Sequence, residues 1–269
     1  MTATTAASDL LATIVAATER IVETRSREVP FGVLEARCAG GRRPDGQAFE
    51  AALRTSAAPR VIAECKRRSP SRGILRADYD PAAHARAYAA AGAAAISVLT
   101  EPTFFDGALE HLAAVRAAVS VPVLRKDFVV SEYQLLEAVA AGADAVLLIV
   151  SALDEGRLRR LAGMADGLGL ACLIEVHDTT EIARAVDAGA RLIGVNSRNL
   201  RTLAVDGEVL ERAASLLPAG TTAVAESGIR TTADIARLTA MGYHAFLVGE
   251  RLITQPDPGA ALRELRGTA

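Results

Sequence analysis

The feature that most constrains this chain is a regular alternation of short apolar runs with longer segments of helical periodicity, which begins near residue 60. Runs with the length and composition of buried strands occur at 61–66, 94–99, 121–125, 144–149, 170–175, 191–196, 221–226 and 244–249. The segments between them, such as 132–140 and 231–241, have the periodicity of helices. Strands that alternate with helices predict a parallel sheet with right-handed crossovers.

A closed barrel and an open doubly wound sheet both use this alternation, and two observations favour the barrel. The strand-like runs number eight, which is the number that closes a (β/α)8 barrel. The first run is not followed by the G-x-G-x-x-G turn that a dinucleotide-binding sheet carries at that place. We therefore predict an α/β fold, a (β/α)8 TIM barrel.

The segment before the first strand-like run predicts an N-terminal helical extension. A length of 269 residues suits one domain, with the extension at 1–58 and the barrel proper at 59–269. The apolar stretch 10–17 follows Asp9 and has no basic residue before it, which favours an amphipathic helix over a signal peptide. The apolar run 145–150 is too short to span a bilayer. We expect a cytoplasmic protein.

Charge and composition exclude several classes of partner. The formal net charge of −2 creates no field that favours nucleic acid or a membrane surface. An anionic small-molecule ligand must therefore be held by local groups. The four histidines and three cysteines show no metal-ligand spacing, so we predict no metal site. Nothing in the sequence specifies an oligomeric partner.

Polar side chains gather where the predicted strands end. In a barrel of this kind the chemistry lies at the C-terminal ends of the strands, because the loops that follow them converge there. A structural ion pair could explain any one of these residues, but the whole set would require several strands to share that explanation. The set comprises Glu64, Lys66, Lys126, Asp127, Glu175, Asn196, Arg198, Glu226, Ser227, Gly249 and Glu250.

The two lysines are the most informative members of this set. Of the 30 basic residues only Lys66 and Lys126 are lysine, and the rest are arginine. Only about four basic residues fall at strand ends, so both lysines falling there by chance is about a one-in-seventy event. Arginine does not release a proton at neutral pH, whereas a partly desolvated lysine can. The two lysines therefore indicate proton transfer or contact with an oxyanion.

Three loops are candidates for binding a phosphate. Barrels often bind phosphate after the seventh and eighth strands, close to the N-terminus of a short helix. Gly228 and Gly249 lie in those loops and would let backbone N–H groups approach the ligand, although glycine also suits a tight turn. The loop after the first strand adds the hydroxyls of Ser69 and Ser71 and a basic residue, Arg72.

At these residues the sequence resembles the indole-3-glycerol-phosphate synthase family. The segment 64–73 (ECKRRSPSRG) is similar to the family signature E-x-K-x-x-S-P-S-x-G. Further similar segments, in the expected order from about Phe49 to the C-terminus, are ISVLTE at 96–101 with Phe105 and Gly107, LRKDF at 124–128, LIE at 173–175, GVNSRNL at 194–200 and AESGI at 225–229. Cys65 stands where a branched aliphatic residue is usual, and Glu250 stands where some members have serine. At position 250 the resemblance therefore supports a phosphate contact from the backbone and not one from the side chain.

The resemblance implies ring closure of 1-(o-carboxyphenylamino)-1-deoxyribulose 5-phosphate to indole-3-glycerol phosphate, with loss of CO₂ and water and without cofactor or metal. It implies that Lys126 is the general acid and that Glu175 transfers protons, with Glu64 nearby. Lys66 and Arg198 would contact anions. Asn196 would orient the substrate and Glu226 would complete the polar network. The substrate would also be lined by Phe105 and Ser227, and its phosphate by Ser69, Gly228 and Gly249. The extension would cover the site.

Two other functions remain open at this point. One is another phosphate-binding barrel isomerase, of the kind that uses a cysteine–aspartate pair or two aspartates. Strand alternation places Glu64 and Lys66 on one face and Cys65 on the other, which argues against a catalytic cysteine there. The other is a non-catalytic barrel subunit, although such a protein should have lost some of the charged strand ends.

Overall fold

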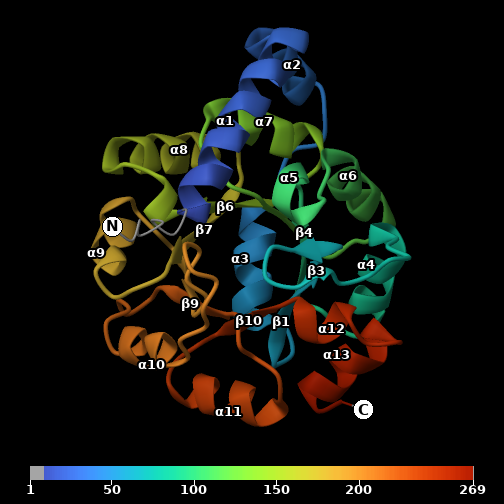
Figure 1. Ribbon diagram of the computed structural model, residues 1–269, viewed down its shortest axis with the longest axis vertical. Coiled ribbons are helices and arrows are strands. Elements are labelled where there is room, and N and C mark those ends of the chain that lie inside the picture. Colours follow the sequence, from blue (N-terminus) through green and yellow to red (C-terminus); the bar gives the residue numbers. More distant parts are fainter. Residues whose placement is uncertain (1–8, 269) are drawn as a thin grey trace, which may run out of the picture.

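A computed structural model describes residues 9–268 and contains a closed barrel of eight parallel strands ringed by helices (Figure 1). Neighbouring strands follow the order β1-β10-β9-β8-β7-β6-β5-β4 around the barrel. The predicted (β/α)8 fold is therefore confirmed. The strands are β1 (Arg60–Cys65), β4 (Ala95–Leu99), β5 (Val123–Lys126), β6 (Ala145–Ile149), β7 (Ala171–Val176), β8 (Leu192–Asn196), β9 (Thr222–Glu226) and β10 (Ala245–Val248).

The observed strands lie within two residues of the predicted ranges because the continuous apolar runs, bounded by polar residues, leave little freedom in where a buried strand begins and ends. The sequence did not predict a small antiparallel hairpin, β2 (Arg68–Ser69) and β3 (Gly73–Ile74), which follows β1. Its two strands are too short to show a period-two pattern. The hairpin projects from the C-terminal end of the barrel.

Helices surround the barrel and connect its strands (Figure 1). Side-chain N-caps such as Ser131, Asp154 and Thr231 start several of them by accepting backbone N–H bonds. The connecting helices are α4 (Pro81–Ala90), α5 (Pro102–Phe105), α6 (Leu109–Ala118), α7 (Glu132–Ala140), the 3-10 turn η1 (Val150–Ala152), α8 (Glu155–Gly167), α9 (Glu181–Asp187), α10 (Glu208–Ala214) and α11 (Thr232–Ala240). Two further helices, α12 (Glu250–Ile253) and α13 (Pro258–Arg266), follow the last strand.

The predicted extension is helical and contacts both ends of the barrel. Its helices are α1 (Leu10–Glu28), α2 (Phe31–Ala39) and α3 (Gly46–Thr55). Helix α3 closes the N-terminal end, where Phe49 and Leu53 are fully buried among side chains from the barrel interior. Helix α1 lies at the opposite end, against α5, α7 and η1.

The extension therefore shares its core with the barrel. The boundary at residue 58 stays a prediction, and the first eight residues of the predicted extension lie outside the described residues. In the described range 9–268, no helix is long and apolar enough to cross a membrane. The cytoplasmic location stays a prediction.

Gly46 allows the close contact between α3 and the loop before β7. A Cβ atom at this position would lie 2.7 Å from Gly169 O and 2.8 Å from Leu170 C, both backbone atoms that cannot move aside. We expect Gly46→Ala to cost about 1–3 kcal/mol, which corresponds to a fall of roughly 3–10 °C in melting temperature.

Thermal melts of Gly46→Ala and Gly32→Ala test this contact. Gly32 lies in α2, and a Cβ atom there would meet nothing within 4 Å. Gly32→Ala should leave the melting temperature unchanged or raise it slightly, because alanine favours a helix over glycine by about 1 kcal/mol. Equal melting temperatures for the two variants would contradict this account of α3.

Candidate active site

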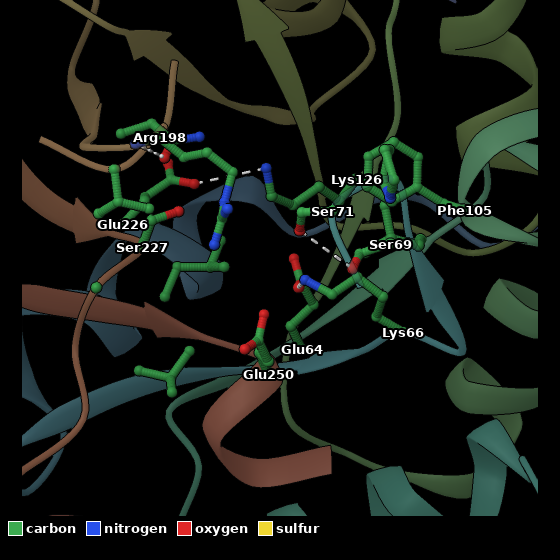
Figure 2. A pocket seen from close by; sticks show the side chains of 18 of the residues that line it. Glu64, Lys66, Ser69, Ser71, Phe105, Lys126, Arg198, Glu226, Ser227 and Glu250 are labelled. Atoms are coloured by element: carbon green, nitrogen blue, oxygen red, sulfur yellow. Dashed lines mark hydrogen bonds and ion pairs between the residues drawn. The ribbon is translucent and has the colours of Figure 1, made fainter. Parts of the chain in front are cut away.

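A cavity of about 510 Å³ opens at the C-terminal ends of the strands. The cavity brings together residues from strand ends and loops that are far apart in the sequence, and Figure 2 shows ten of their side chains labelled. All twelve residues predicted for the site line it, namely Glu64, Lys66, Ser69, Phe105, Lys126, Glu175, Asn196, Arg198, Glu226, Ser227, Gly228 and Gly249.

Lys126 lies between two buried carboxylates at the centre of the cavity. Its Nζ is 3.0 Å from Glu175 Oε2, with which it forms a hydrogen bond, and 3.5 Å from Glu226 Oε2. Figure 2 shows Lys126 reaching across the cavity toward Glu226. The three side chains come from β5, β7 and β9, and both carboxylates are about 1% exposed. We call Lys126, Glu175 and Glu226 the central cluster.

The charges of the central cluster shift one another's pKa. Burial alone would lower the pKa of Lys126, but the carboxylates of Glu175, Glu226 and Glu64 outweigh burial and raise it. Burial would raise the pKa of Glu175, but the Lys126 ammonium and His177 lower it. Burial, followed by the charge of Glu175, raises the pKa of Glu226. Lys126 is therefore a protonated cation, and Glu226 is the carboxyl group that takes up a proton most readily.

From the sequence, a desolvated lysine was expected to give up its proton easily. This expectation is wrong for Lys126 in the free protein, because its pKa is raised. Desolvation acts in the expected direction, but three carboxylates gather around the lysine only in the folded barrel.

Glu64 and Lys66 form a second ion pair at the end of β1, on the cavity side. Cys65 between them points outward, and its Sγ lies 3.8 Å from the Pro81 carbonyl oxygen at the start of α4. The predicted alternation across this strand is confirmed. Cys65 is fully buried away from the cavity, so it cannot reach a ligand there.

Two glycines make room for these carboxylates. A Cβ atom on Gly194 in β8 would lie closer than 3.0 Å to Glu226 Oε1, and one on Gly249 would lie that close to Glu64 Oε1. From the sequence, Gly249 was connected only with phosphate, and Gly194 was part of a family segment but received no role. Gly194 was missed because a glycine in a strand marks a close approach without identifying the group that approaches.

The hydroxyl and glycine loops line another part of the cavity, where Ser69 comes from the β2–β3 hairpin. Ser227 and Gly228 follow β9 with left-handed φ angles of 65° and 73°. Glu250 forms an ion pair with Arg72 at 3.1 Å, so its side chain neutralises a cation of this region.

Arg198, Asn196 and Phe105 complete the predicted set. The Arg198 guanidinium donates to the Leu203 carbonyl at 3.1 Å, and its backbone N–H donates to Asn196 Oδ1 at 3.0 Å. Phe105 lies against Phe128, with ring centroids 6.1 Å apart. The loop after β8 therefore holds a cation at the edge of the cavity, and α5 contributes an aromatic face.

Asp127 was grouped with the strand-end residues, but its carboxylate is bound by structural partners. Asp127 Oδ2 lies 2.9 Å from Arg125 Nη2 and accepts a hydrogen bond from Thr100 Oγ1 at 2.5 Å. Arg125 is completely buried and also pairs with Glu137 at 3.1 Å. A structural ion pair, with Arg125, therefore explains the Asp127 carboxylate.

Several residues near the cavity were not predicted from the sequence. His177 Nε2 lies 3.0 Å from Glu175 Oε1. The signal for it was its position two residues after Glu175, which turns both side chains to one face. Arg230 and Arg251 also line the cavity without having been predicted, whereas Ser71, which lines it too, belongs to the loop expected to add hydroxyls. In the part of the chain that the structure describes, no group of three or more His, Cys, Asp or Glu side chains could hold a metal ion, and the lack of a cofactor stays a prediction.

The opposite pKa shifts of Glu226 and Glu175 predict opposite effects on stability. Glu226 has a raised pKa, so the stability it contributes when protonated is lost as the pH rises from about 4.5 to about 8. Glu226→Gln should therefore raise the melting temperature, and by more above that range than below it. Glu175 has a lowered pKa, so its charge contributes stability that is lost only as the pH falls below its ordinary value.

Glu175→Gln is the matched variant and should lower the melting temperature throughout the neutral and alkaline range. Thermal melts of the two variants and the unchanged protein, recorded at several pH values, measure both effects. Shifts of the same sign for the two variants would contradict the charge distribution described for the central cluster.

Sequence comparison identifies close relatives. A family model described as indole-3-glycerol phosphate synthase matches residues 11–265. An indole-3-glycerol phosphate synthase from Parafrankia sp. is 54% identical over 243 residues, which cover 90% of this chain and 89% of that protein. One from Rhodospirillum rubrum is 46% identical over 263 residues, which cover 97% of this chain and 100% of that protein.

Solved structures with low sequence identity share the fold. The thiamine phosphate pyrophosphorylase from Pyrococcus furiosus has a TM-score of 0.62 at 19% identity, covering 82% of this chain and 96% of that one. The N-acetylmannosamine-6-phosphate 2-epimerase from Clostridium perfringens has a TM-score of 0.59 at 14% identity, covering 77% of this chain and 91% of that one. These two likenesses concern the barrel alone. The family match over residues 11–265, together with relatives 46% and 54% identical, shows that this chain belongs to the indole-3-glycerol phosphate synthase family.

Proposed function

We propose that this chain catalyses the ring closure of 1-(o-carboxyphenylamino)-1-deoxyribulose 5-phosphate to indole-3-glycerol phosphate, with release of CO₂ and water. The observation that carries the proposal is the central cluster, in which a protonated lysine and two carboxylates with different proton affinities face one cavity. Such a cluster can supply both an acid and a base. Family membership supports the same reaction.

The substrate carries a phosphate, a carboxylate and an aromatic ring, and the cavity offers partners for each. Its volume of about 510 Å³ lies within the usual range for small-molecule sites. The phosphate would bind at the hydroxyl and glycine loops, which contain Ser69, Ser227, Gly228 and Gly249. The carboxylate would lie near the cations of Lys66 and Arg198. The face of Phe105 would contact the aromatic ring, and Asn196 would orient a substrate hydroxyl or amine.

The first step forms the carbon–carbon bond of the new ring. The aromatic carbon that bears the carboxylate attacks the ribulose carbonyl carbon, and negative charge develops on the carbonyl oxygen. Lys126 would donate its proton to that oxygen and so form a hydroxyl group. Its raised pKa keeps it protonated until an acceptor as basic as an alkoxide appears.

The remaining steps break three bonds, one to CO₂, one to the hydroxyl and one to a proton, and restore aromaticity. Loss of CO₂ leaves its electron pair in the ring. The new hydroxyl then departs as water with a proton from an acid, for which Lys66 is placed at the cavity wall beside Glu64. Glu175 would take the proton from the adjacent carbon as the indole double bond forms, while Glu226 completes the polar network. Two protons are delivered and one is removed, so each turnover takes up one proton from solvent.

The alternatives from the sequence have less support. A cysteine-based isomerase would need a thiol in the cavity, and Cys65 points to the helix side of β1. A non-catalytic barrel would have no need for two buried carboxylates beside a lysine, because unpaired burial of charge is costly. The direct test is a turnover assay followed by indole fluorescence, with a chelator present, since the proposed steps require no metal. No fluorescence increase with the authentic substrate would refute the proposal.

Replacing Lys126 by arginine tests the acid. Lys126→Arg keeps the positive charge but cannot donate a proton at neutral pH. We expect the turnover number to fall by about 10²–10⁴-fold, the usual contribution of a positioned acid. Lys66→Arg removes the other proposed proton donor, the acid of the dehydration step, so we expect its turnover to fall as well. Turnover of Lys126→Arg within about tenfold of the unchanged enzyme, a difference of roughly 1.4 kcal/mol, would contradict the assignment.

Replacing Gly228 tests the phosphate subsite. Gly228→Ala adds a methyl group next to the proposed phosphate and also strains a left-handed backbone by about 1–2 kcal/mol. Gly220→Ala controls for the strain, because Gly220 has a φ of 89° and lies in the loop before β9, at the opposite end of the barrel. We expect similar melting temperatures for the two variants and a raised KM only for Gly228→Ala. An unchanged KM for Gly228→Ala would contradict the placement.

A further inference from the structure

His177 contacts the central cluster but has no role in the function proposed above. His177 Nε2 lies 3.0 Å from Glu175 Oε1, while Lys126 Nζ lies 3.0 Å from Glu175 Oε2. The imidazole contact has an ion-pair distance but is not aligned as a hydrogen bond, and among the described residues neither of its two buried atoms has a hydrogen-bond partner. Glu175 is therefore flanked by two basic groups, one at each carboxylate oxygen.

A second carboxylate holds the other side of the imidazole. The His177 backbone N–H donates to Glu181 Oε2 at 2.7 Å, and His177 Nδ1 lies 3.7 Å from the same oxygen. Ser151 Oγ, in η1, is 3.4 Å from Nδ1. Glu181 is the first residue of α9 and its side chain is 13% exposed, against 9% for His177. The end of β7, α9 and η1 thus fix the ring in place.

The two flanking carboxylates favour the charged imidazolium. Burial alone would lower the pKa of His177, but Glu175 and Glu181 raise it to about 9. The ring therefore carries a positive charge at neutral pH. It is not among the described residues that line the cavity, so a substrate would not take its proton directly.

A second cation matters at the moment when Lys126 transfers its proton. Lys126 then becomes neutral, and Glu175 loses the charge on its Oε2 side. A fully buried carboxylate without a counter-charge is strongly disfavoured, and the nearby carboxylate of Glu226 adds to the penalty. Without compensation Glu175 would itself take up the proton and could no longer act as a base. The imidazolium remains on the Oε1 side throughout.

We propose that His177 is a positioning residue that keeps Glu175 ionised and in place while Lys126 gives up its proton. The cluster can then hold an acid and a base side by side without the base quenching the acid. This inference rests on the proposed function, from which it takes the roles of Lys126 and Glu175.

The expected pH dependence of activity follows from all the charged groups that face Glu175 and His177. Glu175 faces Lys126 from β5, Glu226 from β9 and His177, with Glu64 acting on the cluster from β1. His177 itself faces Glu175 and, from α9, Glu181. Removing the imidazolium takes away one of the two cations that lower the pKa of Glu175. That pKa must rise, and activity must be lost at a higher pH on the acid side.

The experiment compares His177→Asn with His244→Asn by steady-state kinetics over a pH series. His244 precedes β10 at the opposite end of the barrel, where its ring accepts the Ala223 backbone N–H at 3.1 Å. For His177→Asn we expect kcat at neutral pH to fall by about 10–100-fold with KM within about threefold, an effect on chemistry more than on binding. The acid limb of its kcat profile should move up by about one pH unit. The kcat and pH profile of His244→Asn should match those of the unchanged enzyme. A folded His177→Asn enzyme with unchanged kcat and acid limb would overturn the inference.

A second variant keeps the test decisive if His177→Asn does not fold. Glu181→Gln leaves the imidazole in place but removes one of the carboxylates that hold its proton. The His177 titration midpoint, measured by NMR on histidine labelled with ¹⁵N, should fall from about 9, and the alkaline limb of kcat should move down with it. If the titration midpoint falls and the kcat profile stays unchanged, His177 does not act on Glu175.

The NMR measurement also separates this inference from the proposed function. An unchanged protein that fails to convert the authentic substrate refutes the function, whatever the state of His177. A neutral His177 at pH 7 in a protein that does convert the substrate refutes the inference alone. A midpoint in Glu181→Gln equal to that of the unchanged protein also overturns it, because the proposed pairing with Glu181 would then be absent.

Discussion

Burying a lysine with two carboxylates inside the end of a barrel imposes requirements on the surrounding structure. Lys126, Glu175 and Glu226 come from three strands, and each would be costly to bury alone. Their mutual contacts reduce that cost only if the strands hold them within ion-pair distance. The closed barrel does this, because its parallel strands point the three side chains to one interior and cannot move apart independently. Much of the remaining site can be understood as support for this cluster.

Part of that support is the space that two glycines leave beside the carboxylates of the site. A Cβ atom at Gly194 or Gly249 would overlap the carboxylate of Glu226 or Glu64, which would then have to shift. Gly194 lies inside β8, where a glycine weakens the strand, whereas Gly249 directly follows β10. The same glycines are compatible with a turn or a phosphate contact, which is why the surrounding side chains are needed to explain them.

A second form of support lies behind the cluster, on the outer face of β5. Arg125 is fully buried next to Lys126 and donates to Asp127, Thr100 and the Gln134 carbonyl. Glu137 accepts a hydrogen bond from Arg125 and also pairs, at 3.2 Å, with Arg25 in α1. Because the partners are paired and buried, the network fixes the strand that carries Lys126. It also connects that strand to the extension, whose helix α1 lies at the same end of the barrel.

The amino-acid sequence was sufficient to predict the fold class, the strand positions and twelve of the residues that line the cavity. Apolar runs separated by helical segments allow few folds, and parallel strands in a barrel bring their C-terminal ends together whatever the details of packing. Glu64 and Lys66 could be placed on one face from alternation alone. The restriction of lysine to two strand ends pointed to two of the cations that line the cavity.

Only the tertiary structure decided which partners these residues have. Asp127 and Glu175 look alike in the sequence, since both are acidic residues at strand ends, and both line the cavity, yet Asp127 pairs with the buried Arg125 and Glu175 pairs with Lys126. The pKa of Lys126 is raised instead of lowered, because its shift depends on carboxylates 49 and 100 residues away along the chain. The contact of His177 with Glu175 and the closeness of Gly194 to Glu226 likewise exist only in the folded barrel. Charge interactions and close packing act over a few ångströms in space, and sequence separation does not report that distance.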